Sequence, residues 1–132
     1  MTKFTSPLHK QEEYSSVVWK HSDAYKSVRY AVRRMSLGQR IEMAERIQVL
    51  SSKYEFLKAG DALEKAEAHL AELLVRRLYL EWGLAVIEGL SIDGEKASVE
   101  LLIEKGPELL GDEIVASIRA ELELSEDERK NS

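Results

Sequence analysis

Cysteine is absent from all 132 residues of this chain. The chain can therefore form no disulfide, offer no thiolate nucleophile, and build no zinc or iron–sulfur site that depends on cysteine ligands. Such a composition suits a cytosolic protein.

Long apolar runs are also missing. The first residues, Met-Thr-Lys-Phe-Thr-Ser-Pro, contain no apolar core of signal-peptide length. No stretch approaches the roughly 18 apolar residues that a membrane span needs. We therefore expect a soluble, cytoplasmic protein with no membrane partner.

Motifs that carry catalysis or bind a cofactor are a third absence. The sequence has no Gly-x-Ser-x-Gly, no phosphate-binding glycine loop and no Gly-x-Gly-x-x-Gly. His9, His21 and His69 fall in no metal-ligand spacing, and His69 with Glu72 would make only half of a carboxylate site. The abundant carboxylates occupy the polar sides of predicted helices, where solvation and pairing are their ordinary roles. We predict no enzyme activity, no metal and no cofactor.

Charge is present in quantity, and its distribution is uneven. Residues 1–60 carry 11 Lys and Arg against 6 Asp and Glu, whereas residues 61–132 carry 8 against 18. Opposite signs in the two halves favour docking within the chain or contact between copies, although both faces could simply be solvated.

The length and a hydrophobic content of 44% fit one domain. Residues 1–13 show no periodicity and are expected to form a flexible leader. Residues 14–35 alternate as a β-hairpin, with Val28, Tyr30 and Val32 on one face. Because a lone hairpin is marginally stable, this face should lie on a helix or join a sheet of another chain.

Two long helices are predicted next, over 37–58 and 61–89, with Ser36 and Asp61 as N-caps and Gly60 between them. The short connection predicts an antiparallel helical hairpin whose apolar stripes face one another. The stripes are Leu37, Ile41, Ala44, Ile47, Leu50, Tyr54 and Leu57 on the first helix and Leu63, Leu70, Leu74, Leu78, Trp82 and Ala85 on the second.

The remainder begins with a turn at Ser91-Ile-Asp-Gly94, in which Ile92 can point inward. Helices are then predicted at 99–105, capped by Ser98, and at 107–124, separated by a Gly-Pro break and followed by a charged tail at 125–132. The fold class is mainly α (α+β): an N-terminal β-hairpin, a long antiparallel helical hairpin and two shorter C-terminal helices.

Two stretches are candidates for binding. Arg29, Arg33, Arg34 and Arg40 could contact phosphates with aromatic side chains nearby, as in a nucleic-acid-binding regulator. An isoelectric point near 5.3 argues against general nucleic-acid binding, and the same arginines could engage the acidic C-terminal helices.

The second candidate is Tyr79-Leu-Glu-Trp-Gly-Leu84, where bulky residues occupy nearly the whole helix circumference. One interpretation buries Trp82 where three helices meet, with Gly83 allowing another backbone to approach closely. The other makes this stretch an exposed apolar patch for a partner.

Several short segments resemble small phage and prophage tail-module proteins, and they are most similar to tail assembly chaperones. The segments are Val28-Arg-Tyr-Ala-Val-Arg-Arg-Met-Ser36, Phe56-Leu-Lys-Ala-Gly60, Tyr79-Leu-Glu-Trp-Gly-Leu84, Glu88-Gly-Leu-Ser-Ile-Asp-Gly-Glu95, Gly106-Pro-Glu-Leu-Leu110 with Glu113-Ile, and Leu124-Ser-Glu-Asp-Glu-Arg-Lys-Asn-Ser132.

This resemblance implies a non-enzymatic protein of the bacterial host cytoplasm that binds tape-measure or tail-tube subunits before the tail is built. It transfers no binding motif. Together with the charge distribution it predicts a protein partner and a homo-oligomer, with nucleic acid as the alternative. The candidate partner-binding residues are Val28, Arg29, Tyr30, Arg33, Arg34, Tyr79, Leu80, Trp82 and Leu84.

Overall fold

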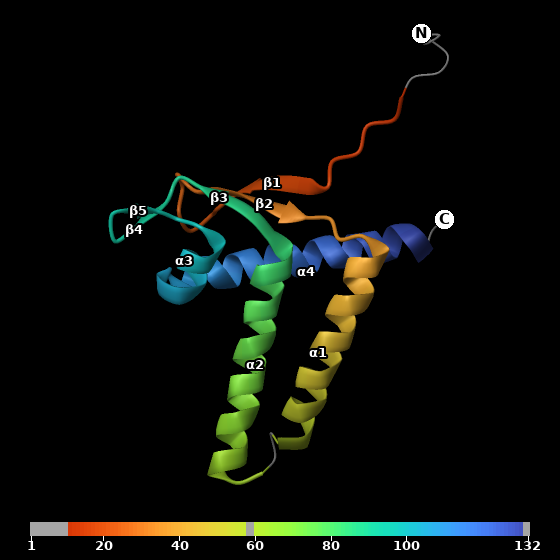
Figure 1. Ribbon diagram of the computed structural model, residues 1–132, viewed down its shortest axis with the longest axis vertical. Helices are drawn as coiled ribbons and strands as arrows, with labels where there is room; N and C mark the ends of the chain where they lie inside the picture. Colours follow the sequence, from red (N-terminus) through yellow and green to blue (C-terminus); the bar gives the residue numbers. More distant parts are fainter. Residues whose placement is uncertain (1–10, 58–59, 131–132) are drawn as a thin grey trace.

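The computed structural model describes residues 11–57 and 60–130, which form a small sheet, a projecting helical hairpin and a long C-terminal helix (Figure 1). The mainly helical α+β fold with an N-terminal β-hairpin is confirmed. Most of the predicted leader lies outside the described residues, and residues 11–13 belong to no helix or strand. The elements are β1 (Val17–His21), β2 (Arg29–Arg33), α1 (Leu37–Leu57), α2 (Ala62–Gly83), β3 (Leu84–Glu88), β4 (Ser91–Ile92), β5 (Glu95–Lys96), α3 (Val99–Lys105) and α4 (Glu108–Lys130).

The helix starts follow from side-chain caps that the sequence predicts. Ser36 and Gln39 exchange hydrogen bonds between side chain and backbone, and Asp61 and Glu64 do the same, so α1 and α2 both begin with a capping box. Ser98 accepts a hydrogen bond from the backbone amide three residues ahead. All three predicted caps are confirmed.

The sheet has the strand order β1-β2-β3, with both pairs antiparallel. The third strand was not predicted. The helix predicted over 61–89 is wrong in its last part: it ends at Gly83, and the next five residues form β3. Their sequence, Leu-Ala-Val-Ile-Glu, is compatible with either state, and the free edge of β2 provides hydrogen-bonding partners that select the strand. A bulge lies at this junction, since Ala31 pairs with Val86 but Val32 pairs with Leu84.

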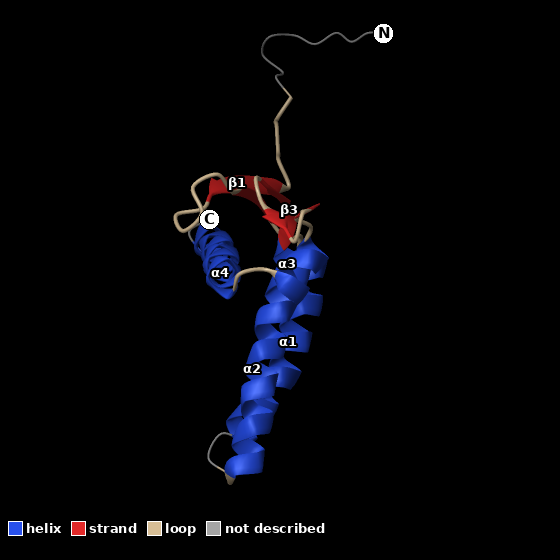
Figure 2. Ribbon diagram, turned by 90° about the vertical axis from the view of Figure 1, so that its left-hand side faces the viewer, coloured by secondary structure: helices blue, strands red, loops and turns tan. Residues whose placement is uncertain are grey.

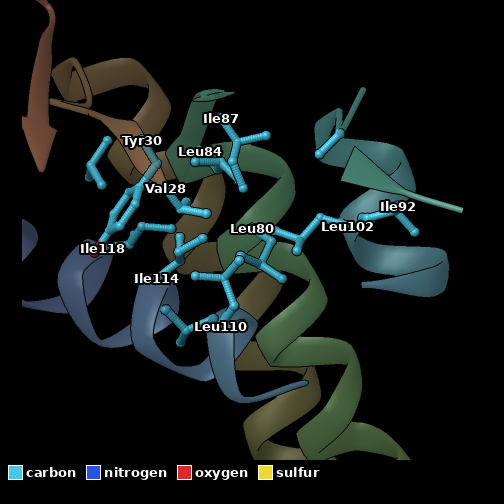
Figure 3. Packing of buried hydrophobic residues seen from close by; sticks show 13 residues of the cluster. Val28, Tyr30, Leu80, Leu84, Ile87, Ile92, Leu102, Leu110, Ile114 and Ile118 are labelled. Atoms are coloured by element: carbon cyan, nitrogen blue, oxygen red, sulfur yellow. The ribbon is translucent and has the colours of Figure 1, made fainter. Parts of the chain in front are cut away.

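The core lies between the inner face of this sheet and α4 (Figure 3). Leu110, Ile114 and Ile118, spaced four apart on α4, are fully buried. They belong to the same cluster as Val28 and Tyr30, so the predicted inner face of the hairpin does lie on a helix. Tyr30 also shares a hydrogen bond of 2.7 Å with Ser117 of α4.

The turn and the Gly-Pro break in the C-terminal half are as predicted, but the last helix is longer than predicted. The turn at residues 91–94 joins β4 to β5, with positive φ at Asp93 and Gly94 and with Ile92 buried. The Gly-Pro break separates α3 from α4 as predicted. However, α4 is as long as α2 and continues through Lys130, because no glycine or proline interrupts the sequence after Gly111. Residues 125–130 of the predicted tail are therefore helical, and residues 131–132 lie outside the described residues.

The helical hairpin projects away from the sheet and α4 (Figure 2). Its two helices pack mainly on each other, and only part of the predicted stripes takes part: Leu78 is buried and Ile47, Leu50 and Tyr54 are half-buried, whereas Leu37, Ile41, Leu63, Leu70 and Leu74 are exposed. The least exposed side chains on this contact are Met43 on α1 and Ala68 and Ala71 on α2. Small alanines allow close approach, and α1 is turned so that Leu37 and Ile41 remain exposed. No described helix combines the length and apolar character that a membrane span requires.

Glu113 joins the loop between β1 and β2 to α4. Its carboxylate accepts hydrogen bonds from the Ser22 hydroxyl at 2.8 Å and from the Asp23 and Ala24 amides at 2.7 and 3.4 Å. Burial acts to raise the pKa of Glu113, but these hydrogen bonds outweigh it and hold the pKa below the ordinary value of 4.5.

We expect Glu113→Gln to lower the free energy of unfolding by about 1 to 2 kcal/mol at pH 7, because hydrogen bonds to an ionised group are lost. A carboxyl whose pKa falls on folding stabilises the protein above its unfolded pKa and loses that contribution as pH falls through the folded pKa. The difference from wild type should therefore shrink below pH 4.5 in urea titrations. A difference that is constant with pH, or that matches exposed Glu104→Gln, contradicts this role.

Gly83 lies where the end of α2 packs against α4. An added Cβ would meet the side chain of buried Ile118 at 2.6 Å. We expect Gly83→Ala to destabilise the protein by about 1 to 3 kcal/mol in thermal and urea unfolding. Gly38→Ala is the matched control: apart from its chain neighbours and the adjacent helix backbone, no atom lies within 4 Å of its Cβ position, so it should gain up to about 1 kcal/mol from helix propensity. Equal stability of the two variants would refute the close approach.

Candidate functional site: a groove between the helical hairpin and the C-terminal helix

Four of the predicted partner-binding residues are part of the core. Val28, Tyr30, Leu80 and Leu84 are almost completely buried (Figure 3). The reason is topological: β2 is the central strand of the sheet, and the end of α2 lies between the sheet and α4. Their side chains are not available on the folded surface, so the prediction that they line a partner surface is corrected.

The predicted arginine cluster is divided between two surfaces. Arg29 lies on the outer face of the sheet, 4.1 Å from the ring centre of Trp19 and 3.3 Å from Glu88 on β3. Arg34 lies 3.5 Å from Glu121 on α4, as expected if first-half arginines engage the acidic C-terminal helices. Arg33 is half-buried. Carboxylates therefore already neutralise part of the cluster, which weakens the nucleic-acid alternative.

The outer face of the sheet carries a small apolar patch. Trp19, Ala31 and Val86 stand in register across the three strands. Trp19 and Val86 are exposed, whereas Ala31 is covered. Three residues make a small patch, which is of the size that ordinary monomers expose.

Tyr79 and Trp82 are both half-buried, and each is covered by a guanidinium group. Arg119 of α4 lies 4.8 Å from the ring centre of Tyr79, and Arg46 of α1 lies 5.5 Å from that of Trp82. Trp82 does not fill a three-helix core, because the end of α2 buries Leu80 and Gly83 against α4 instead. Within this stretch, Tyr79 borders a groove between the helical hairpin and α4.

This groove, of about 440 Å³, lies between α1, α2 and α4. Most of its residues were not among the predicted partner-binding residues. Met35 and Met43, eight residues apart in the sequence, were a usable signal because methionines often line adaptable binding surfaces. Its lining residues are Met35, Arg40, Met43, Ala44, Ile47, Tyr79, Arg119, Leu122 and Glu123.

Exposed apolar side chains extend the groove along α1. Leu37 and Ile41 are 63% and 54% exposed and share a helix face with Ala44, at spacings of four and three residues. The lining combines apolar side chains with the charged side chains of Arg40, Arg119 and Glu123. Such a surface can receive an amphipathic helix with acidic flanks.

The carboxyl and phenol groups with displaced pKa values, Glu113 and Tyr30, lie at the contact between the sheet and α4; burial is the main reason that the pKa of Tyr30 is raised. Among the residues that the structure describes, no group of three or more His, Asp or Glu side chains could hold a metal ion.

The partial exposure of Trp82 changes the expected cost of its removal. The sequence interpretation, a fully buried aromatic, implies about 3 to 5 kcal/mol for Trp82→Ala. With one side covered by Arg46 and the other side partly open, we expect about 1 to 3 kcal/mol in urea unfolding. Arg46→Ala should expose the Trp82 ring further to solvent and so shift its fluorescence emission to longer wavelength. If Trp82→Ala lowered the free energy of unfolding by about 4 kcal/mol or more, Trp82 would instead be a fully buried core residue.

Comparisons with protein-family models, with curated proteins and with solved structures find no match for this chain.

Proposed function

We propose that this protein is a non-enzymatic phage or prophage tail assembly protein, a chaperone that acts in the cytoplasm of the bacterial host. Its client would be a tape-measure or tail-tube subunit, as the resemblance of its short motifs implies. The observation that carries the proposal is the exposure of Leu37 and Ile41 beside the apolar groove.

Exposed leucine and isoleucine side chains at neighbouring positions of one helix are costly in water. Burying each one contributes about 1.5 to 3 kcal/mol relative to leaving it exposed. A client helix lying along α1 would cover both side chains and insert one of its own into the groove. Met35 and Met43 form a floor that can adapt to different client side chains.

The charges at the groove favour a client with acidic flanks. Arg40 and Arg119 are on opposite helices of the groove, and Glu123 is the acidic residue on its rim. Rim charges mainly guide association and orientation, whereas the apolar floor supplies most of the binding free energy. A small interface of this kind gives reversible binding, which a chaperone needs in order to release its client.

The test is co-expression with the tape-measure and tail-tube proteins encoded by the same phage or prophage. Wild type should co-purify with one of them and keep it in the soluble fraction. Leu37→Gln with Ile41→Gln should reduce capture at least about tenfold, because two apolar contacts are replaced by polar side chains.

Leu109→Gln is the matched control, since Leu109 is equally exposed but lies on α4 away from the lining residues of the groove. It should capture the client as well as wild type does. If neither subunit co-purified with the wild-type protein, the proposal would be wrong. Binding to duplex DNA that weakens steeply with salt would favour the nucleic-acid alternative.

A further inference from the structure

A second apolar surface lies on the helical hairpin, on the side away from the groove. Six residues of α2 recur at alternating spacings of four and three, which places them along one side of the helix. We call them the α2 stripe: Leu63, Glu67, Leu70, Leu74, Arg77 and Glu81.

The α2 stripe is open in the monomer. Leu63, Leu70 and Leu74 are 69%, 53% and 37% exposed, and the three charged members are exposed as well. The packing of α1 on α2 uses the neighbouring positions Ala68 and Ala71 and leaves the stripe uncovered. Figure 2 shows that the lower hairpin, which carries Leu63 and Leu70, extends beyond the sheet and α4.

A shallow groove runs beside the upper half of the α2 stripe. Its volume is about 460 Å³, and Val49 and Leu50 of α1 face Leu74 and Leu78 of α2 across it. Val49 is largely exposed. The groove therefore adds apolar surface from α1 to the stripe, and an approaching helix would contact both helices of the hairpin.

The four central residues of the α2 stripe are complementary to themselves when their order is reversed, whereas the outermost pair, Leu63 and Glu81, is not. Positions at equal distance on either side of the midpoint between Leu70 and Leu74 would face each other in an antiparallel pair. The nearest such positions are Leu70 and Leu74 themselves. The second pair is Glu67 and Arg77, which have opposite charge. An antiparallel second copy would therefore place leucine against leucine, and each Glu67 against an Arg77. A parallel copy would place Glu67 against Glu67 and Arg77 against Arg77, which is unfavourable.

The available area fits a modest dimer. From Leu63 to Glu81 the helix rises about 27 Å, and two adjacent helices are about 20 Å wide. Two such faces together bury about 1,100 Å², near the lower limit for specific protein interfaces. Association should therefore depend on concentration rather than be obligate.

We propose that the α2 stripe is a self-association surface, on which a second copy of this chain binds antiparallel about a two-fold axis midway between Leu70 and Leu74. The two hairpins then form a four-helix arrangement with Val49 at its edge. The interface leaves the groove beside Leu37 uncovered, and the proposal does not depend on what that groove binds.

Charge exchange tests the register. In sedimentation velocity over a range of concentrations, wild type should move from monomer to dimer. Glu67→Arg alone, or Arg77→Glu alone, places like charges at two symmetric contacts and should weaken dimerisation at least about tenfold. The double variant E67R/R77E restores opposite charges between copies and should recover the wild-type dimerisation constant within about threefold.

Controls separate the interface from folding and from other surfaces. Leu70→Gln should weaken dimerisation, whereas Leu109→Gln and Leu37→Gln, on other surfaces, should not. Thermal unfolding of every variant, measured at a concentration where wild type is monomeric, identifies any that fail to fold. Replacing Arg77 also removes its ion pair with Glu81, so Glu81→Gln is the control for that loss.

Cross-linking tests the direction of pairing, and the absence of native cysteine makes it unambiguous. Mixing Glu67→Cys protein with Arg77→Cys protein should give a disulfide-linked dimer on oxidation. Either protein alone should not, because like positions are separated by about 15 Å along the helix. Cross-linking of Glu67→Cys with itself, failure of the double charge variant to recover, or a monomer at every concentration would overturn the proposal.

Discussion

The structure depends on the burial of α4 against the inner face of the sheet. Ile114 and Ile118 supply the apolar contact, and neighbouring polar residues attach the surrounding elements to the same helix. Glu113 holds the loop between the first two strands, and Arg34 reaches Glu121. Asp112 pairs with Arg76 of α2. One helix thus fixes both the hairpin of strands and the hairpin of helices, which share few contacts with each other.

This arrangement explains why apolar side chains remain exposed on the helical hairpin. Its upper end is held by α4 and α3, whereas among the described residues the packing of its lower end is mainly that of α1 on α2. An antiparallel helix pair buries one face of each helix, and its remaining apolar residues need a partner from outside the chain. The two proposals assign these residues to different occupants: a client beside Leu37, and a second copy along the α2 stripe.

Local signals in the sequence predicted much of the fold. Ser36, Asp61 and Ser98 cap helices because the interaction spans only three residues, and the Asp-Gly turn needs only its own backbone conformation. The strand after Gly83 could not be predicted in this way, since Ala85 and Glu88 continue the helical periodicity. The free edge of β2, more than 50 residues earlier in the chain, decides that conformation.

The candidate sites were harder to predict for a related reason. Helical spacing shows that Leu63, Leu70 and Leu74 share a face of the helix. The spacing does not show whether that face meets α1 or another molecule. The rotation of α2 about its own axis decides which of its faces meets α1, and the burial of Ala68 and Ala71 marks that face. Likewise, the arginines near β2 formed a cluster in sequence, and only the position of α4 showed that Arg34 has a carboxylate partner.

The direct connection from α2 to β3 has a mechanical consequence. Gly83 ends the helix and Leu84 begins the strand, so no loop absorbs motion between them. With 22 residues, α2 is about 33 Å long, and its C-terminal end continues directly into β3, an edge strand of the sheet. The orientation of the helical hairpin and the position of the sheet edge are therefore set by one continuous piece of backbone.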